Sequence, residues 1–279
     1  MYMILSSRNI LFRVGTILSV AILIFFAIST IITISLYNDL VSEAAHRSKG
    51  LAQTLLAHIF QPYPYTAFIS MIIALLYATV VTVLIYLFFE KTQSPEMLFF
   101  FLFAFSFAFE GLRAIIPIAR LYNMPNMILI IAARILLFGR YFGLFSLFAA
   151  SIYASGFEIQ KQGLSIFIIA IVSLIISLGI PIDGLAWDTS LTMLSGYPFM
   201  FLMLEVGIVL ITMTNFFVAA HSKGSQEYIF SAIGASLAIL GKHILITADV
   251  WPACLLGLGI LTGGTWLLCS RLHRFYLWL

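Results

Sequence analysis

The stretch FEGLRAIIPIARLYNMPNMILIIAARILLFGR, residues 109–140, decides the fold class. Most of it is apolar enough for the interior of a lipid bilayer. It nevertheless contains one carboxylate and four guanidinium groups, namely Glu110, Arg113, Arg120, Arg134 and Arg140. A charged side chain inside a membrane costs at least about 2.5–3.5 kcal/mol, so such groups face the interior of a helix bundle and pair there. The stretch therefore predicts a bundle of membrane-spanning helices that encloses charges.

The composition of the whole chain points to the same class. Of the 279 residues, 62% are hydrophobic and 9% are charged, and the mean hydropathy is +1.11. Soluble domains carry about 25% charged residues, so composition excludes an ordinary soluble globular protein. The net charge of +3 is dispersed, without a run of Lys or Arg. The expected partner is therefore the lipid bilayer, and no nucleic-acid partner is expected.

Eight apolar stretches are long enough to cross a bilayer, which takes about 20 residues. Short segments rich in Gly, Pro and polar residues separate them. The predicted fold is an all-α integral membrane protein with about eight transmembrane helices. The predicted spans are Ile10–Tyr37, Thr66–Phe89, Met97–Leu121, Met127–Ser151, Gly163–Ile180, Phe199–Ala220, Ile229–Ala248 and Pro252–Cys269.

Three parts are expected along the chain: an N-terminal anchor helix (1–37), a short outer amphipathic helix or loop (38–65) and a seven-helix bundle (66–279). The first apolar stretch is longer than the hydrophobic region of a secretory signal and lacks a clear cleavage site, so we expect it to remain. In residues 38–65, apolar residues recur at helical spacing. This pattern indicates a helix that lies on the membrane or caps the bundle.

The basic residues of the loops predict the orientation, because cytoplasmic loops carry an excess of Lys and Arg. With the N-terminus inside, the cytoplasmic segments hold Arg8, Arg13, Lys91, Lys161, Lys223, Arg271 and Arg274, and the outer segments hold Arg47, Lys49 and Arg120. Both termini are therefore predicted inside (N-in/C-in). The predicted location is the bacterial cytoplasmic (inner) membrane.

A layer of ionisable side chains is predicted near the midplane and in the outer half of the membrane. Counting about 1.5 Å per residue from the midpoint of each span places residues of four spans at similar depths. Glu110 and Arg113, three residues apart, are expected to support each other on one helix face. Lys242 is expected to pair with Glu205, because consecutive spans are commonly antiparallel neighbours. The layer consists of Glu110, Arg113, Arg134, Glu205, Lys242 and His243.

Two interpretations of this layer stay open. The charges can be interhelical ion pairs that fix the packing, or they can line a water-filled pocket open to the outside. Three basic residues against two carboxylates leave a positive surplus, which favours an anionic ligand. The leading hypothesis is a non-enzymatic membrane protein that binds or senses a small anionic ligand. The alternatives are a small proton-coupled transporter that uses Glu110 or Glu205, and a structural subunit of a larger membrane complex.

The layout of an anchor, a short outer helix and seven further spans resembles that of bacterial seven-helix sensor modules, although no residue motif accompanies it. The chain ends at RLHRFYLWL without an output domain, so signalling would need a partner protein. No catalytic motif occurs, and Ser236 lies about 10 Å along the helix from His243, beyond hydrogen-bond reach. No cofactor and no metal site are expected.

The remaining features of the spans predict packing. Gly139 and Gly143 are four residues apart, as are Gly259 and Gly263, and small residues at this spacing allow close helix approach. Arg140 is predicted to lie just below the midplane, apart from the charged layer.

Overall fold

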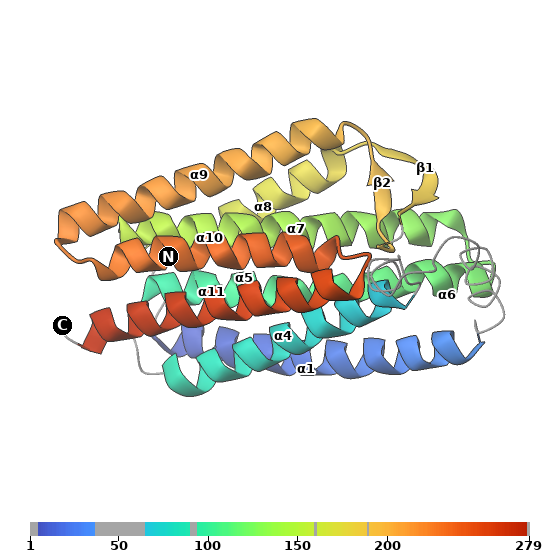
Figure 1. The fold of residues 1–279 in the computed structure, drawn as a ribbon, viewed down its shortest axis with the longest axis horizontal. Coiled ribbons are helices and arrows are strands. Elements are labelled where there is room, and N and C mark those ends of the chain that lie inside the picture. The colour runs from blue at the N-terminus through green and yellow to red at the C-terminus, as the bar shows by residue number, and fades with distance from the viewer. Residues whose placement is uncertain (1–4, 37–64, 90–93, 159–160, 189, 278–279) are drawn as a thin grey trace, which may run out of the picture.

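The computed structural model describes residues 5–36, 65–89, 94–158, 161–188 and 190–277, which form a bundle of long helices with a small β-hairpin at one end (Figure 1). In this part of the chain, eight helices are long and apolar enough to cross a membrane. The predicted all-α membrane class and the number of spans are thereby confirmed. The protein is built as a polytopic membrane protein. Its predicted orientation and its predicted inner-membrane location stay predictions.

The described helices overlap all eight predicted spans, and the second has the predicted bounds. The predicted helix in segment 38–65 falls outside the described residues, except for Tyr65. In chain order the elements are α1 (Leu5–Leu36), α4 (Thr66–Phe89), α5 (Pro95–Ser106), the 3₁₀ helix η1 (Phe107–Ala114), α6 (Ile115–Leu121), α7 (Asn126–Ala154), α8 (Gln162–Gly179), β1 (Ile182–Trp187), β2 (Met193–Ser195), α9 (Pro198–Lys223), α10 (Glu227–Ile246) and α11 (Trp251–Leu277).

One span, made of α5, η1 and α6 in succession, lies at the centre of the bundle and is more buried than the other seven. Helices α1, α4 and α7 pack around it, and α8 and α9 lie beyond α7 (Figure 1). Its first half fills the core with five phenylalanines that are at most 1% exposed: Phe99, Phe100, Phe101, Phe103 and Phe107. Helix α1, predicted as an anchor, packs the ring of Phe12 at a tilt against that of Phe101, and its Ser19 hydrogen-bonds to Thr82 of α4.

The start of the central span follows ordinary helix chemistry. Ser94 has extended backbone dihedrals, and its hydroxyl accepts a hydrogen bond from the backbone N–H of Met97. Pro95 occupies the first turn, where no N–H is needed, and Glu96 places a carboxylate near the positive end of the helix dipole. These three residues set the point at which the helix begins.

Helices α10 and α11 form a tight antiparallel pair in which glycines face the backbone of the other helix. A Cβ on Gly264 would lie 2.6 Å from the backbone nitrogen of Ala238, and a Cβ on Gly241 would meet the backbone of Leu261. Among the described residues, nothing lies within 4 Å of such an atom on Gly259 or Gly263, so the prediction of close packing at that pair was wrong. The four-residue spacing would allow a close helix contact, but in the described part of the chain these two glycines do not face another helix.

The predicted contact at Gly139 and Gly143 of α7 is confirmed. A Cβ on Gly139 would be 2.5 Å from the ring of Phe109, and one on Gly143 would be 2.8 Å from the Cβ of Ser106. The missing side chains therefore let α7 approach the central span closely where that span changes from α5 to η1.

In the loop after α8 the structure has a β-hairpin, which the all-α prediction did not include. Strands β1 and β2 pair antiparallel, with Ile182 opposite Ser195 and Trp187 opposite Met193, and the register is irregular between these pairs. Strands this short carry too few residues for a two-residue hydrophobic period to stand out in the sequence. We call this end of the bundle the hairpin end and the opposite end, where α11 finishes, the C-terminal end.

Candidate functional site

The central span leaves α-helical geometry where its charged residues lie. Two features accompany the change: Gly111 lets the ring of Phe26 come within 3 Å of where a Cβ would be, and Pro117 has no N–H to donate to the carbonyl of Arg113. A 3₁₀ helix has three residues per turn, so side chains three apart lie directly above one another. Glu110 and Arg113 therefore share one face of η1.

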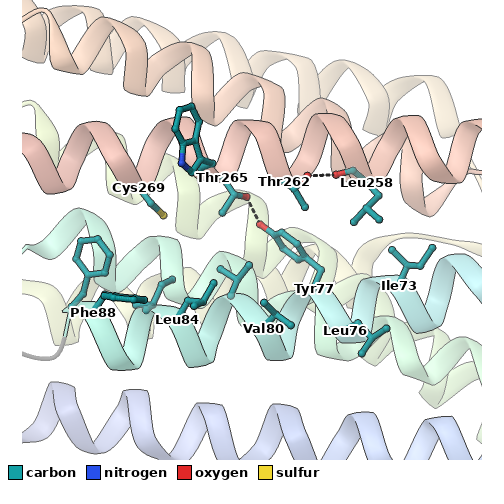
Figure 2. Close-up of a pocket in the computed structure, with 14 residues that line it drawn as sticks. Ile73, Leu76, Tyr77, Val80, Leu84, Phe88, Leu258, Thr262, Thr265 and Cys269 are labelled. Atoms are coloured by element: carbon teal, nitrogen blue, oxygen red, sulfur yellow. Dashed lines mark hydrogen bonds between the residues drawn. The ribbon is translucent and has the colours of Figure 1, made fainter.

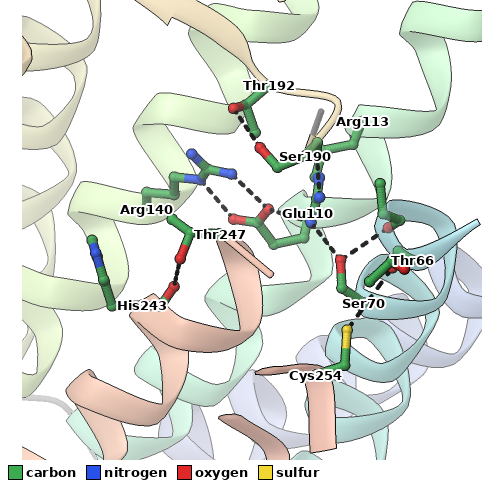
Figure 3. A network of polar contacts seen from close by, with 11 residues as sticks. Thr66, Ser70, Glu110, Arg113, Arg140, Ser190, Thr192, His243, Thr247 and Cys254 are labelled. Carbon is green, nitrogen blue, oxygen red and sulfur yellow. Dashed lines mark hydrogen bonds and ion pairs between the residues drawn. The ribbon is translucent and has the colours of Figure 1, made fainter. Parts of the chain in front are cut away.

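Glu110 is the centre of a buried ion cluster (Figure 3). Arg140 of α7 binds both of its carboxylate oxygens, with Nε 2.8 Å from Oε1 and Nη2 3.0 Å from Oε2. Arg113 lies further away, with Nη1 3.8 Å from Oε2. The expected proximity of Glu110 and Arg113 is confirmed, but setting Arg140 apart was wrong. Counting residues locates the Cα atom, and a long Arg side chain carries its guanidinium several ångströms away from it.

Arg113 connects the central span to two other parts of the bundle. Its Nη1 donates to the hydroxyl of Ser70 on α4 at 3.3 Å, and its Nη2 donates to the backbone carbonyl of Ser190 between β1 and β2. The side chain is fully buried, and its Nε has no hydrogen-bond partner among the described residues. Arg113 therefore holds the hairpin against the bundle, directly beside Glu110.

Lys242 of α10 reaches the same cluster from another side. Its ammonium group donates to the backbone carbonyl of Arg140 at 3.1 Å and lies 5.4 Å from the ring centre of Phe107. Glu205 of α9 is half-buried and interacts electrostatically with Arg140 and Lys242. No ion pair within 4 Å joins Glu205 to Lys242 in the described part of the chain, so the expected pair does not form; the lysine takes the carbonyl instead.

The other two predicted site residues lie outside this cluster. Arg134 of α7 donates through Nη1 to the carbonyls of Ser177, at 2.5 Å, and Ile180. It therefore caps the C-terminal end of α8, where backbone carbonyls lack helical partners. The side chain of His243 is exposed, and Figure 3 shows it apart from the pair of Glu110 and Arg140.

The resulting cluster, which we call the charged cluster, consists of Glu110, Arg113, Arg140 and Lys242. It holds one carboxylate and three cations. Arg140 uses Nε and Nη2 on Glu110, which leaves Nη1 without a hydrogen-bond partner among the described residues, and its side chain is 22% exposed. Lys242 uses one of its three N–H donors in the same part of the chain. The cluster therefore has both positive charge and hydrogen-bond donors to spare.

Three residues of the network were missed from sequence: Arg140, Ser70 and Ser190. A signal existed for Arg140, because it lies between the two α7 glycines that face the central span. Serines are common in membrane helices and in loops, so nothing marked Ser70 or Ser190.

A second buried carboxylate lies at the C-terminal end of the bundle. Glu96 is fully buried; Ser94 donates to it at 2.9 Å and the Tyr228 hydroxyl donates to it at 3.4 Å. Lys223 donates to the same tyrosine hydroxyl at 2.9 Å. The predicted span began at Met97, so it did not include Glu96, which lies in the first turn of α5. Among the described residues, no group of three or more His, Cys, Asp or Glu side chains could hold a metal ion.

Comparison with known proteins adds one partial likeness. No family model matches the chain, and no solved structure matches it. An uncharacterized protein of Treponema pallidum (strain Nichols) is 32% identical to it over 89 residues. The match covers 32% of this chain and 26% of that protein, so the chain spans about a quarter of the relative's length. Functional assignment therefore depends on the charged cluster.

Proposed function

We propose that this polytopic membrane protein is a non-enzymatic receptor that binds a small anion at the charged cluster. The observation that carries the proposal is the surplus of cationic donors on Arg140 and Lys242. Burying a charge without a partner is costly, and an incoming carboxylate or similar group would supply that partner.

The roles of the four residues follow from their contacts. Arg113 is fully buried and committed to Ser70 and Ser190, so it serves as structure. Glu110 holds one edge of the Arg140 guanidinium and thereby directs Nη1 away from itself. Arg140 and Lys242 supply the donors, and a planar guanidinium suits a carboxylate or phosphate oxygen. Including the nearby Glu205, the net charge of the site is +1, which suits a ligand with one negative charge.

Transport coupled to protons is the weaker alternative. A carboxylate that exchanges protons across a membrane needs a relay of polar groups on both sides. Along the central span, residues 97–109 contain no ionisable side chain and Ser106 is their single hydroxyl. Binding without translocation therefore fits this span better. A signalling role would require a partner protein, and a purely structural subunit would retain its cluster without any ligand.

Thermal unfolding of the purified full chain tests the proposal. The probes are acetate, lactate, glutamate, sulfate and inorganic phosphate, with chloride as the baseline. At least one monoanion should raise the Tm, because a ligand at 100 times its Kd stabilises by about 2.7 kcal/mol. Lys242→Gln should lose this shift, whereas Lys161→Gln, at an exposed ion pair, should keep it. No shift in the wild-type protein, or an unchanged shift in Lys242→Gln, would contradict the proposal.

The proposal also requires that the hairpin end faces outward. Reporter fusions at Gly184 should then read outside, and fusions at Gln162 and Gly224 should read inside. An outside reading at Gln162 would overturn both the orientation and the outward-facing site.

A further inference from the structure

Helices α4 and α11 border an apolar groove with a volume of about 470 Å³ (Figure 2). Its rim is open to the surroundings of the bundle, since Phe88 is 67% exposed and Trp266 is 72% exposed. On its floor the hydroxyl of Tyr77 is 2.6 Å from that of Thr265, which itself donates to the carbonyl of Leu261. The two hydroxyls satisfy each other and leave an apolar surface.

The groove is long and narrow. On α4 it runs from Ile73 to Phe89, a rise of 16 residue steps or about 24 Å at 1.5 Å per residue. One leaflet of the hydrocarbon core is about 15 Å thick, half of about 30 Å, so the groove is longer than one leaflet is thick. A volume of about 470 Å³ spread over this length accommodates one straightened hydrocarbon chain rather than a bulky ring system.

The end of the groove at Phe89 is basic. The ring of His273 packs against the ring of Phe89 with centroids 5.3 Å apart. His273 follows Cys269 by one helical turn, so it continues the stripe of α11 that lines the groove. Arg274 is adjacent, its side chain is 60% exposed, and its ion pair with Glu227 is long, at 3.9 Å. A cationic group and an imidazole therefore stand where the groove reaches the C-terminal end of the bundle.

From this geometry we propose that the groove is a binding site for an anionic phospholipid. One acyl chain lies straightened between α4 and α11, and the headgroup phosphate accepts hydrogen bonds from Arg274 and His273. Charge complementarity at one end and an open apolar channel along the rest match the two parts of such a lipid. The headgroup end of the site, at Phe89, is separated along α4 by 19 residues, or about 28 Å, from Ser70, which Arg113 of the charged cluster binds. The lipid proposal does not depend on the anion-binding proposal.

Quenching of Trp266 fluorescence by bromine-labelled lipids tests the proposal, because Trp266 lines the groove. The full chain keeps Trp266 while the other three tryptophans are replaced by Phe (Trp187, Trp251 and Trp278). It is reconstituted in vesicles of phosphatidylcholine that contain either brominated phosphatidylglycerol or brominated phosphatidylcholine. Brominated phosphatidylglycerol should compete for the site roughly fivefold better, the worth of one basic residue facing an anionic lipid.

Two variants distinguish binding of phosphatidylglycerol in the groove from its general electrostatic attraction to the protein surface. Arg274→Gln should abolish the preference for phosphatidylglycerol, because it removes the phosphate partner. Thr262→Phe, which fills the groove, should abolish it as well, whereas Leu255→Phe, at a 65% exposed position of α11 outside the groove, should not. Equal quenching by both lipids in the parent, or a preference that survives Thr262→Phe, would overturn the proposal.

A second measurement covers the case in which the single-tryptophan chain does not fold. Mass spectrometry of the detergent-purified protein with all four tryptophans should find retained phosphatidylglycerol, and Thr262→Phe should reduce it severalfold. Retention that is equal in the two proteins would count against the groove.

Discussion

The two halves of the central span, α5 and η1, are both buried but are stabilised by different interactions. In α5 the helix is regular, capped at its start by Ser94, and stabilised by phenylalanines that are almost completely buried. In η1 the backbone tightens into a 3₁₀ helix around Glu110 and Arg113, which are equally buried but charged. Buried apolar area has no preferred direction, whereas a buried ion pair requires its partners at one position and orientation. Helix α5 therefore contributes apolar packing, and η1 fixes the positions and orientations of the charged side chains.

This difference predicts where the bundle tolerates change. Apolar packing responds mainly to volume, so α5 should accept Leu or Met in place of Phe at modest cost. The charged half should accept very little, because each guanidinium depends on Glu110 and on the α7 contact that Gly139 and Gly143 permit. The following predictions compare the two halves, in order of decreasing effect on the free energy of unfolding.

The largest effect is expected at the carboxylate. Glu110→Gln leaves Arg113 and Arg140 buried without a counter-charge, and breaking a buried pair in this way costs about 3–5 kcal/mol. Denaturant unfolding of the purified protein measures the loss. Glu205→Gln is the matched control, since this half-buried carboxylate forms no ion pair within 4 Å in the described part of the chain, and it should cost less than about 1 kcal/mol. Equal losses of unfolding free energy in Glu110→Gln and Glu205→Gln would show that the charged half is no more sensitive to substitution than its surroundings.

The next effect is expected in the packed half. Phe101→Ala removes a ring whose centroid is 4.7 Å from that of Phe12 and should cost about 3–4 kcal/mol through lost contacts and a cavity. Phe101→Leu should recover most of that loss. Phe199→Ala, at a 70% exposed position, is the control and should change the same free energy by about 0.5 kcal/mol or less. If Phe101→Leu were as damaging as Phe101→Ala, packing in α5 would depend on ring geometry rather than on volume.

A smaller effect is expected at the glycine of η1. A methyl group on Gly111 would come within 3 Å of the Phe26 ring, so Gly111→Ala should cost about 1–3 kcal/mol by overpacking. Gly207→Ala on α9 adds an atom with no described residue within 4 Å and should be neutral or stabilise by up to about 1 kcal/mol. The Tm of each variant distinguishes the two. If Gly111→Ala raised the Tm, the close approach of Phe26 of α1 would not be the reason for a glycine at this position.

The smallest effect is expected at the start of α5. Ser94→Ala removes the cap of the Met97 N–H and one donor to Glu96, and caps of this kind are worth about 1 kcal/mol. Ser222→Ala, at an exposed serine near the end of α9, is the control and should change stability by about 0.5 kcal/mol or less. A Ser94→Ala loss as large as that of Glu110→Gln would remove the contrast between the halves, because the buried Glu96 would then be as dependent on its partners as Glu110.

Much of the fold could be predicted because its signals are local. Each apolar run of about 20 residues is a span whatever its neighbours are, and all eight were found to within a few residues except at the ends of α1 and α11. The burial of Glu110 and Arg113 follows from the cost of charge in lipid. The short strands escaped prediction because β pairing needs a partner elsewhere in the chain.

The sequence by itself determined which helices exist and where along each helix every charge lies. Only the tertiary structure decided which charges meet. Depth follows from counting residues along one helix, but the partner of a side chain depends on which helices are neighbours, how each is rotated and how far a long side chain reaches. For this reason Arg140, predicted to stand apart, is the main partner of Glu110, while Arg134, predicted to belong to the charged layer, binds the carbonyl groups at the end of α8.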